Sequence, residues 1–446
     1  MESSLAPPPA ARPRKVALAS LVGTTVEWYD FFIYATAAAL VFREVFFPQG
    51  MNPVVGSVVA FGTTSFGYVG RPIGALLFGH FGDRVGRRTT LVITILTMGV
   101  ATFGIGLLPS YATLGIAAPL LLVTLRLVQG IAVGGEWGGA ALMSVEHAPE
   151  HRKSFMGSFT QVGSAVGALL SSLMFALSSG IAGPMEDGSW RIPFLFSGVL
   201  VVVGLLIRTR VEESPVFTEL ARTDDLAVAP VKEAVLRHRG VILLAAGAMV
   251  VATGGYYVTS SFWLVYATGS GGLPETTALN VLSVEAAFEI LCTVGAGWLA
   301  DRLGTSRVVV TGLLSAAVIA PVWFLAAHSG SLLFVLLASA LIAIPTGLHY
   351  GPMARLLVDL FPGRVRYSAM SMAYQLAALT AGTLTPVAVS LLYGSGGTGP
   401  VTLVLLYLAV LCALSTWCVL ALGRRTHGAA TGKPEPSGTR RAPATP

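Results

Sequence analysis

The chain has 446 residues, of which 54% are hydrophobic and only 11% are charged, and its mean hydropathy is +0.74. A soluble core could not hide that much apolar surface, so this composition excludes a soluble protein. The net charge of +6 lies in short basic clusters between apolar segments, which indicates orientation in a membrane rather than binding to nucleic acid.

Apolar runs recur along the whole chain, and each is long enough to cross the roughly 30 Å of hydrocarbon in a bilayer. They cover residues 17–42, 54–79, 89–109, 115–143, 154–179 and 190–208, and then 240–266, 276–299, 307–327, 331–355, 367–393 and 399–422. Six runs followed by six more predict an all-α membrane protein with twelve transmembrane helices in two six-helix bundles.

Polar stretches flank and separate these bundles. We predict an N-terminal tail at 1–16, a first bundle at 17–208, a linker at 209–239, a second bundle at 240–423 and a disordered tail at 424–446. The three cysteines, Cys292, Cys412 and Cys418, lie in apolar runs without metal-ligand spacing, so we expect them to be packing residues. No cofactor and no metal are expected.

The basic residues are distributed unevenly between the two sets of loops. One set holds Arg12, Arg14, Lys15, Arg84, Arg87, Arg88, Arg152, Lys153, Arg302, Arg307, Arg364 and Arg366, together with the bases of the linker and the tail. The opposite loops hold only Arg43 and Arg191. Because cytoplasmic loops carry the excess of Lys and Arg, we expect a multi-pass protein of the cell inner (plasma) membrane with both termini in the cytoplasm.

Two joints in the chain resemble each other. The joint after the second run reads Gly79-His-Phe-Gly-Asp83-Arg84-Val-Gly86-Arg87-Arg88, and the joint after the eighth reads Gly297-Trp-Leu-Ala-Asp301-Arg302-Leu-Gly304-Thr-Ser-Arg307. Corresponding joints in two six-span halves indicate duplication, so the bundles should be pseudo-symmetric.

The GxxxDRxGRR pattern of the first joint, with its degenerate copy after the eighth run, resembles the signature of the major facilitator superfamily. Further motifs resemble its metabolite:proton symporter family. They are Gly23-Thr-Thr-Val-Glu27-Trp28-Tyr29-Asp30-Phe31-Phe32, Arg71-Pro72-Ile-Gly74, Arg126-Leu-Val-Gln129-Gly130 with Gly134-Gly135-Glu136, Trp190-Arg191-Ile-Pro193-Phe194, Glu213-Ser-Pro215-Val-Phe217 and Phe361-Pro-Gly-Arg364-Val-Arg366-Tyr367-Ser368. These motifs span nearly the whole chain.

The resemblance implies the major facilitator fold and proton-coupled symport of a small polar metabolite by alternating access. The family carries shikimate, α-ketoglutarate, citrate, and proline or betaine. An organic acid is therefore the leading solute class, and a zwitterionic compatible solute such as proline or betaine is the alternative. Proton-antiport efflux of a metabolite or drug is also open. The expected partners are the solute, protons and the lipid bilayer, with no nucleic acid, and one chain should function as a monomer.

Charged residues inside the apolar runs are costly in a bilayer and point to function. Glu27 and Asp30 are three residues apart, hence on one helical face near mid-membrane, and Arg71 lies at similar depth in the second run. We expect Arg71 to contact one of these acids, and at least one acid to carry the coupling proton. The alternative is a permanent ion pair that joins two spans.

The fourth and fifth runs add further candidates. Arg126 offers a planar fork of donors for a solute carboxylate, or else forms a salt bridge with Glu136 or with an acid of the first run. Glu136 joins the candidate proton-coupling acids. Gln161 and Tyr34 are candidate solute-binding residues, whereas the glycines beside Gln161 indicate close helix packing.

Polar side chains in the second half complete the candidate site. Glu289 is the most costly and is a second titrating site or a partner for an arginine. The candidate solute-binding residues are Tyr256, Tyr257, His349, Tyr374 and Gln375. His349 can titrate near neutral pH, although a single histidine is more often a hydrogen-bonded packing residue.

The duplicated joints predict a gate rather than a solute site. Its residues are Gly79, Asp83, Arg84, Gly86, Arg87, Arg88, Asp301 and Arg302. Asp83 can hold nearby helix ends in one conformation and release them in another. The competing interpretation is that the arginines only set topology. An enzyme is not expected, because the sequence shows no nucleophile with its base, no paired histidine ligands and no Walker loop.

Overall fold

The computed structural model describes residues 13–48, 50, 53–183, 188–394 and 400–431. Within these ranges the chain consists of helices joined by short turns, with no strand. Eleven described helical segments are long and apolar enough to cross a membrane, and α3 (Pro53–Arg84), of 32 residues, completes a set of twelve. The predicted all-α architecture of twelve spans is confirmed.

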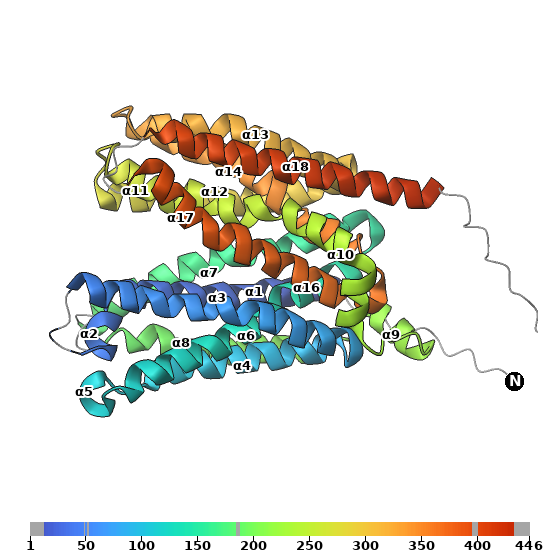
Figure 1. The fold of residues 1–446 in the computed structure, drawn as a ribbon, viewed down its shortest axis with the longest axis horizontal. Coiled ribbons are helices and arrows are strands. Elements are labelled where there is room, and N and C mark those ends of the chain that lie inside the picture. Colours follow the sequence, from blue (N-terminus) through green and yellow to red (C-terminus); the bar gives the residue numbers. More distant parts are fainter. Residues whose placement is uncertain (1–12, 49, 51–52, 184–187, 395–399, 432–446) are drawn as a thin grey trace, which may run out of the picture.

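The first half of the chain forms one bundle, drawn in blue to green in Figure 1. Its spans are α1 (Pro13–Leu40), α3, α4 (Arg87–Leu107), α6 (Ala117–Glu146), α7 (Lys153–Ala182) and α8 (Arg191–Arg208). The short helices α2 (Phe42–Phe46) and α5 (Tyr111–Leu114) lie together at one end of the molecule, which we call the far end.

The second half forms a bundle beside the first (Figure 1). Its first span is α10 (Pro230–Ala248), which continues through the π-helical turns Val251–Gly255 and Val258–Phe262 into α11 (Trp263–Thr268). The next spans are α12 (Glu275–Leu303), α13 (Thr305–Ala326), and α14 (Leu332–Tyr350) followed by α15 (Met353–Val358). The last two are α16 (Arg366–Ala377), which leads through the π-helical turn Ala378–Gly382 into α17 (Thr383–Tyr393), and α18 (Val401–Thr431).

The connection between the halves contains the helix α9 (Pro215–Arg222), which Ser214 caps by accepting a hydrogen bond from the Phe217 N–H at 3.3 Å. It lies opposite the far end, and we call this the linker end (Figure 1). Helix α10 starts at Pro230 rather than at residue 240, because proline fits the first helical turn and Glu233 complements the helix dipole there.

The predicted disordered tail is partly helical, since α18 continues to Thr431. Its remainder, residues 432–446, and most of the predicted N-terminal tail, residues 1–12, lie outside the described residues.

Helices α3 and α6 approach each other closely through glycines. A Cβ added to Gly130 would lie 2.1 Å from the carbonyl oxygen of Gly67, and one added to Gly74 would lie 1.8 Å from that of Ile131. Only glycine permits this separation, because each distance is far below a van der Waals contact. The contact places Arg71 of α3 and Arg126 of α6 side by side in one cavity.

Candidate functional site

A chain of hydrogen bonds connects Asp30 on α1 with Arg126 on α6. The Thr102 hydroxyl lies 2.6 Å from Asp30 Oδ2, and Gln129 Nε2 donates to Thr102 Oγ1 at 2.8 Å. Arg126 Nη1 in turn donates to Gln129 Oε1 at 2.6 Å. All four side chains are buried, so the acid and the guanidinium interact through two neutral residues rather than by direct contact.

The two buried arginines pack on aromatic rings. The Arg126 guanidinium lies 4.0 Å from the ring centroid of Tyr34, whose hydroxyl donates to Thr63 at 2.7 Å. The Arg71 guanidinium lies 4.8 Å from the ring of Tyr68. Such contacts partly compensate a cation for the loss of water.

A small cavity in the first half brings the predicted charges together. We call it the N-half cavity; it has an empty volume of about 260 Å³ and is lined by Glu27, Arg71 and Arg126 among others. The expected Arg71 contact with Glu27 or Asp30 was wrong, since no ion pair within 4.0 Å joins them among the described residues. Glu27 Oε2 and Asp30 Oδ1 are buried without a hydrogen-bond partner.

Glu136 is paired with a residue that the sequence analysis did not consider. The Arg208 guanidinium binds both Glu136 carboxylate oxygens, one of them at 3.0 Å, and Thr94 donates to the same carboxylate at 2.6 Å. The expected alternative of an Arg126–Glu136 salt bridge was therefore wrong. Gly23 makes room for this pair, because a Cβ there would overlap Arg208.

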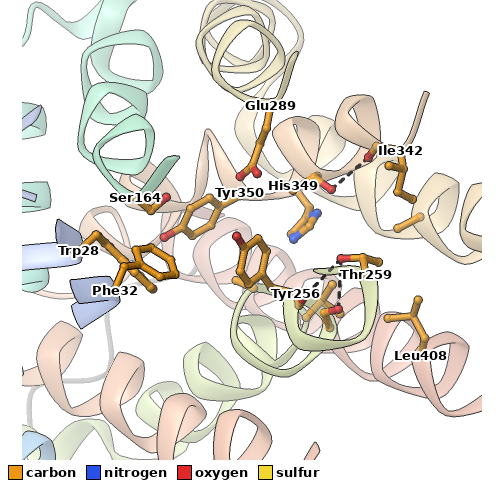
Figure 2. A pocket seen from close by; sticks show the side chains of 15 residues that line it. Trp28, Phe32, Ser164, Tyr256, Thr259, Glu289, Ile342, His349, Tyr350 and Leu408 are labelled. Atoms are coloured by element: carbon orange, nitrogen blue, oxygen red, sulfur yellow. Dashed lines mark hydrogen bonds between the residues drawn. The ribbon is translucent and has the colours of Figure 1, made fainter. Parts of the chain in front are cut away.

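A larger cavity lies between the two halves, and we call it the central cavity. It has an empty volume of about 620 Å³, including space open to solvent. From the first half, Trp28, Phe32 and Ser164 line it; from the second half, Tyr256, Thr259, Glu289, Thr346, His349 and Tyr350 are its polar and aromatic lining residues. Figure 2 shows the Glu289 carboxylate, the His349 ring and the Tyr256 hydroxyl facing the same space.

Of the predicted second-half residues, Tyr256, Glu289 and His349 line the central cavity, and three others lie elsewhere. Tyr257 packs against the hydrophobic core. The Tyr374 ring stacks on Trp137 with a centroid separation of 4.3 Å, and Gln375 Nε2 contacts the Gly134 carbonyl at 3.5 Å. Tyr374 and Gln375 therefore contact the first half.

Gln161 also joins the halves instead of lining the central cavity. Its Oε1 accepts from Trp137 Nε1 at 2.8 Å, and its Nε2 donates to the Tyr350 carbonyl at 3.2 Å. Both ends of the amide are therefore used in this conformation.

The predicted gate residues lie at the linker end, where Asp83 binds the N-terminus of α16. Its carboxylate accepts from the backbone N–H groups of Tyr367 at 3.1 Å and Ser368 at 2.8 Å. Arg87 lies 3.5 Å from Asp83 and donates to the Gly363 carbonyl at 2.7 Å. A carboxylate at a helix N-terminus is favourable because the exposed N–H groups and the helix dipole attract it.

The second joint has the same arrangement with the halves exchanged: its aspartate comes from the second half and binds the start of a helix in the first half. Asp301 on α12 accepts from the backbone N–H groups of Ser154 at 2.8 Å and Phe155 at 2.9 Å, at the start of α7. The backbone conformations of the two joints are also alike. Gly86 and Gly304 occupy corresponding positions and have φ of 124° and 97°, values that residues with an L side chain rarely adopt.

The remaining gate arginines differ in their surroundings. Arg84 is exposed, Arg302 stacks over Trp298 at 3.7 Å, and the backbone N–H of Arg88 donates to Glu213 at 3.2 Å. Two further ion pairs join the halves here and were missed from the sequence. Glu146 binds Arg366 at 2.8 Å, and Glu150 binds Arg355 at 3.0 Å. Arg355 also binds Asp301 of its own half at 3.1 Å.

Direct bonds between the halves are confined to one side of the molecule. Among the described residues, the hydrogen bonds between the halves extend from the linker end to the level of Gln161 and Gln375, and none lies around α2, α5 and α11. The structure is therefore closed at the linker end.

Two six-helix halves with a cavity between them, and a joint with the same backbone contacts in each half, are typical of membrane transporters built from two repeats. Residues 15–233 match the model of the family "Sugar (and other) transporter", and residues 244–446 match that of the "Major Facilitator Superfamily". The chain belongs to the major facilitator superfamily, a family of transporters rather than enzymes.

Several curated proteins resemble nearly the whole chain. The inner membrane metabolite transport protein YhjE of Escherichia coli K12 is 39% identical over 93% of this chain and 94% of its own length. The shikimate transporter of the same organism is 40% identical over 92% and 95%. The proline/betaine transporter of Salmonella typhimurium is 33% identical over 84% and 76%.

The fold also agrees with solved structures. The proton:xylose symporter XylE bound to 6-bromo-6-deoxy-D-glucose gives a TM-score of 0.70, with 18% identity, over 92% of this chain and 95% of that one. The predicted major facilitator fold is confirmed.

Proposed function

We propose that this chain is a proton-coupled symporter that carries a small polar metabolite across the inner (plasma) membrane by alternating access. One chain supplies both halves and the cavity between them, so a single chain forms a complete transport unit. The linker end faces the cytoplasm in this proposal, because most of the Lys and Arg residues in the loops lie there.

One observation carries the proton-coupling part of the proposal. Glu27 and Asp30 are 2% and 1% exposed, form no ion pair in the described part of the chain, and each leave one carboxylate oxygen without a hydrogen bond. An ionised carboxylate in such a place costs far more free energy than a protonated one. Each acid can therefore take up a proton when its surroundings change, and Asp30 is the leading candidate.

Two solute classes have support. The shikimate transporter, at 40% identity, favours an organic acid such as shikimate or a di- or tricarboxylate. The proline/betaine transporter, at 33% identity, favours a zwitterionic compatible solute.

Uptake into proteoliposomes tests the proposal. Labelled shikimate, α-ketoglutarate, citrate and betaine would be offered with an imposed pH gradient, inside alkaline. We expect one solute to accumulate above its external concentration, and Asp30→Asn to abolish accumulation while preserving exchange. The matched control is Asp224→Asn, because Asp224 is exposed on the linker. Solute accumulation that is the same with and without the pH gradient would refute symport. Unchanged accumulation by the D30N variant would show that Asp30 does not carry the coupling proton.

A further inference from the structure

The central cavity is lined by one acidic side chain and by no lysine or arginine. Glu289 is 6% exposed and lines the cavity, and in the part of the chain that the structure describes it has neither a hydrogen bond nor an ion pair. None of the lining residues is Lys or Arg. When it is ionised, an unpaired carboxylate facing a cavity within the membrane creates a negative field there, which attracts cations and opposes anions, and a cation beside it in turn stabilises the ionised form.

The imidazole of His349 adds a second acceptor to the same space. Its Nδ1 lies 2.9 Å from the Pro345 carbonyl oxygen, which can only accept, so Nδ1 carries the hydrogen. In the neutral ring, Nε2 is then left as an acceptor. Figure 2 shows the ring beside Glu289 and Tyr256.

Aromatic rings from both halves line one side of the cavity. Trp28 and Phe32 of α1 lie with their ring centroids 5.7 Å apart, and the Tyr350 ring lies next to them (Figure 2). The faces of such rings attract substituted ammonium groups, and Trp is the most effective.

The buried arginines do not offset this negative character. Arg71 and Arg126 line the separate N-half cavity, and the Arg126 Nη1 group is already bonded to Gln129. A dicarboxylate in the central cavity would therefore meet Glu289 without a cation beside it. A solute with a positive nitrogen would meet a counter-ion, an acceptor nitrogen and aromatic faces.

We infer that the central cavity recognises a solute that carries a positively charged nitrogen, with Glu289 as its counter-ion and the rings of Trp28 and Tyr350 against its substituents. The inference rests on the proposed transport function and narrows its solute to the ammonium-bearing class. The organic-acid class becomes the contrary outcome of the test.

The test is a binding measurement on purified full-length protein in detergent, with no pH gradient, read as the ligand-dependent rise in melting temperature. The probes are glycine betaine and tert-butylacetate, which has the same shape and carboxylate but a carbon in place of the charged nitrogen. We expect betaine to bind at least tenfold more tightly than tert-butylacetate, and E289Q to reduce that preference tenfold or more. The matched control is E275Q, at the exposed start of the same helix, and it should keep the preference.

Three results would overturn the inference: equal binding of the two probes, an unchanged preference in folded E289Q, or stabilisation by shikimate with none by betaine, L-proline or choline. The wild-type comparison decides the question even if E289Q fails to fold. Betaine binding without gradient-driven uptake would refute symport and leave the inference standing. Gradient-driven uptake of shikimate with no binding of the ammonium probes would support symport and refute the inference.

Discussion

The Thr102 hydroxyl lies between two acceptors, 2.6 Å from Asp30 Oδ2 and 3.0 Å from the Met98 carbonyl oxygen. Because a hydroxyl has one hydrogen, it can donate to only one of them at a time. It donates to Asp30 when that acid is ionised; when Asp30 is protonated, Thr102 can accept from the acid and donate to Met98. Thr102 therefore suits both states of a carboxylate that gains and loses a proton.

Replacing Thr102 tests this relationship. Thr102→Val keeps the shape and removes the hydroxyl, so concentrative uptake should fall at least tenfold, consistent with the roughly 1.5–3 kcal/mol of a hydrogen bond to a charged group. Thr102→Ser should restore it. Uptake into proteoliposomes and the number of protons moved per solute are the readouts. Wild-type uptake and stoichiometry in the valine variant would show that Thr102 is only a packing residue.

The Glu136–Arg208 pair should be structural. Removing one partner of a buried pair leaves an uncompensated charge and typically costs about 3–5 kcal/mol, so Glu136→Gln and Arg208→Met should each lower the melting temperature strongly. The double variant should recover part of the loss, because no lone charge remains. Melting curves of the four proteins in one detergent measure this. Glu136→Gln with wild-type stability but no proton coupling would instead support the sequence-based role of Glu136 as a titrating acid.

Asp83 and Asp301 should hold the linker end closed. Asp83→Asn replaces a carboxylate by a neutral amide at the N-terminus of α16, and a loss of about 1.5–3 kcal/mol changes the ratio of closed to open molecules about ten- to one-hundredfold. Spin labels on cysteines at Val85 and Leu303, both exposed at this end, would report the change as a longer distance distribution. The three native cysteines would first be replaced by alanine.

Asp301→Asn should act in the same direction as Asp83→Asn, since Asp301 binds the start of α7. Asp359→Asn is the control, because the Asp359 carboxylate pairs with Arg355 of its own half and, in the described part of the chain, with no residue of the first half. A label distance unchanged in both gate variants would reduce these residues to the role of topology signals.

The glycine contact between α3 and α6 should tolerate no side chain. Gly130→Ala places a methyl group 2.1 Å from the Gly67 carbonyl oxygen, so the helices must separate at a cost of about 1–3 kcal/mol or more. The melting temperature and the yield of monodisperse protein should both fall. Gly295→Ala should be neutral or stabilising, because an added Cβ there meets no atom within 4 Å outside the backbone of its own helix. Equal behaviour of the two variants would contradict the close approach of these helices.

The sequence predicts what depends on local pattern. Twelve apolar runs are visible as hydropathy, and Asp83 and Asp301 stand out because they recur in the two joints beside Gly86 and Gly304. Glu27 and Asp30 stand out because a charge within an apolar run is rare.

What the sequence does not predict is which distant side chains meet. Arg208 lies at the end of an apolar run, where a basic residue usually indicates the orientation of the span in the membrane. Its pairing with Glu136 was therefore missed. Thr102 and Thr94 are inconspicuous in apolar helices and become notable only through their bonds to Asp30 and Glu136. The separation of the arginines from the central cavity depends on side-chain direction in packed helices, which spacing alone does not give.

The most direct test of the account is whether solute entry moves protons. Wild-type proteoliposomes containing a trapped pH-sensitive dye would receive the transported solute outside, with no initial pH gradient and with the membrane potential clamped. Proton symport predicts that the interior becomes acidic as solute enters, and that Asp30→Asn abolishes this acidification. Solute entry with no change in internal pH in the wild-type protein would contradict the account.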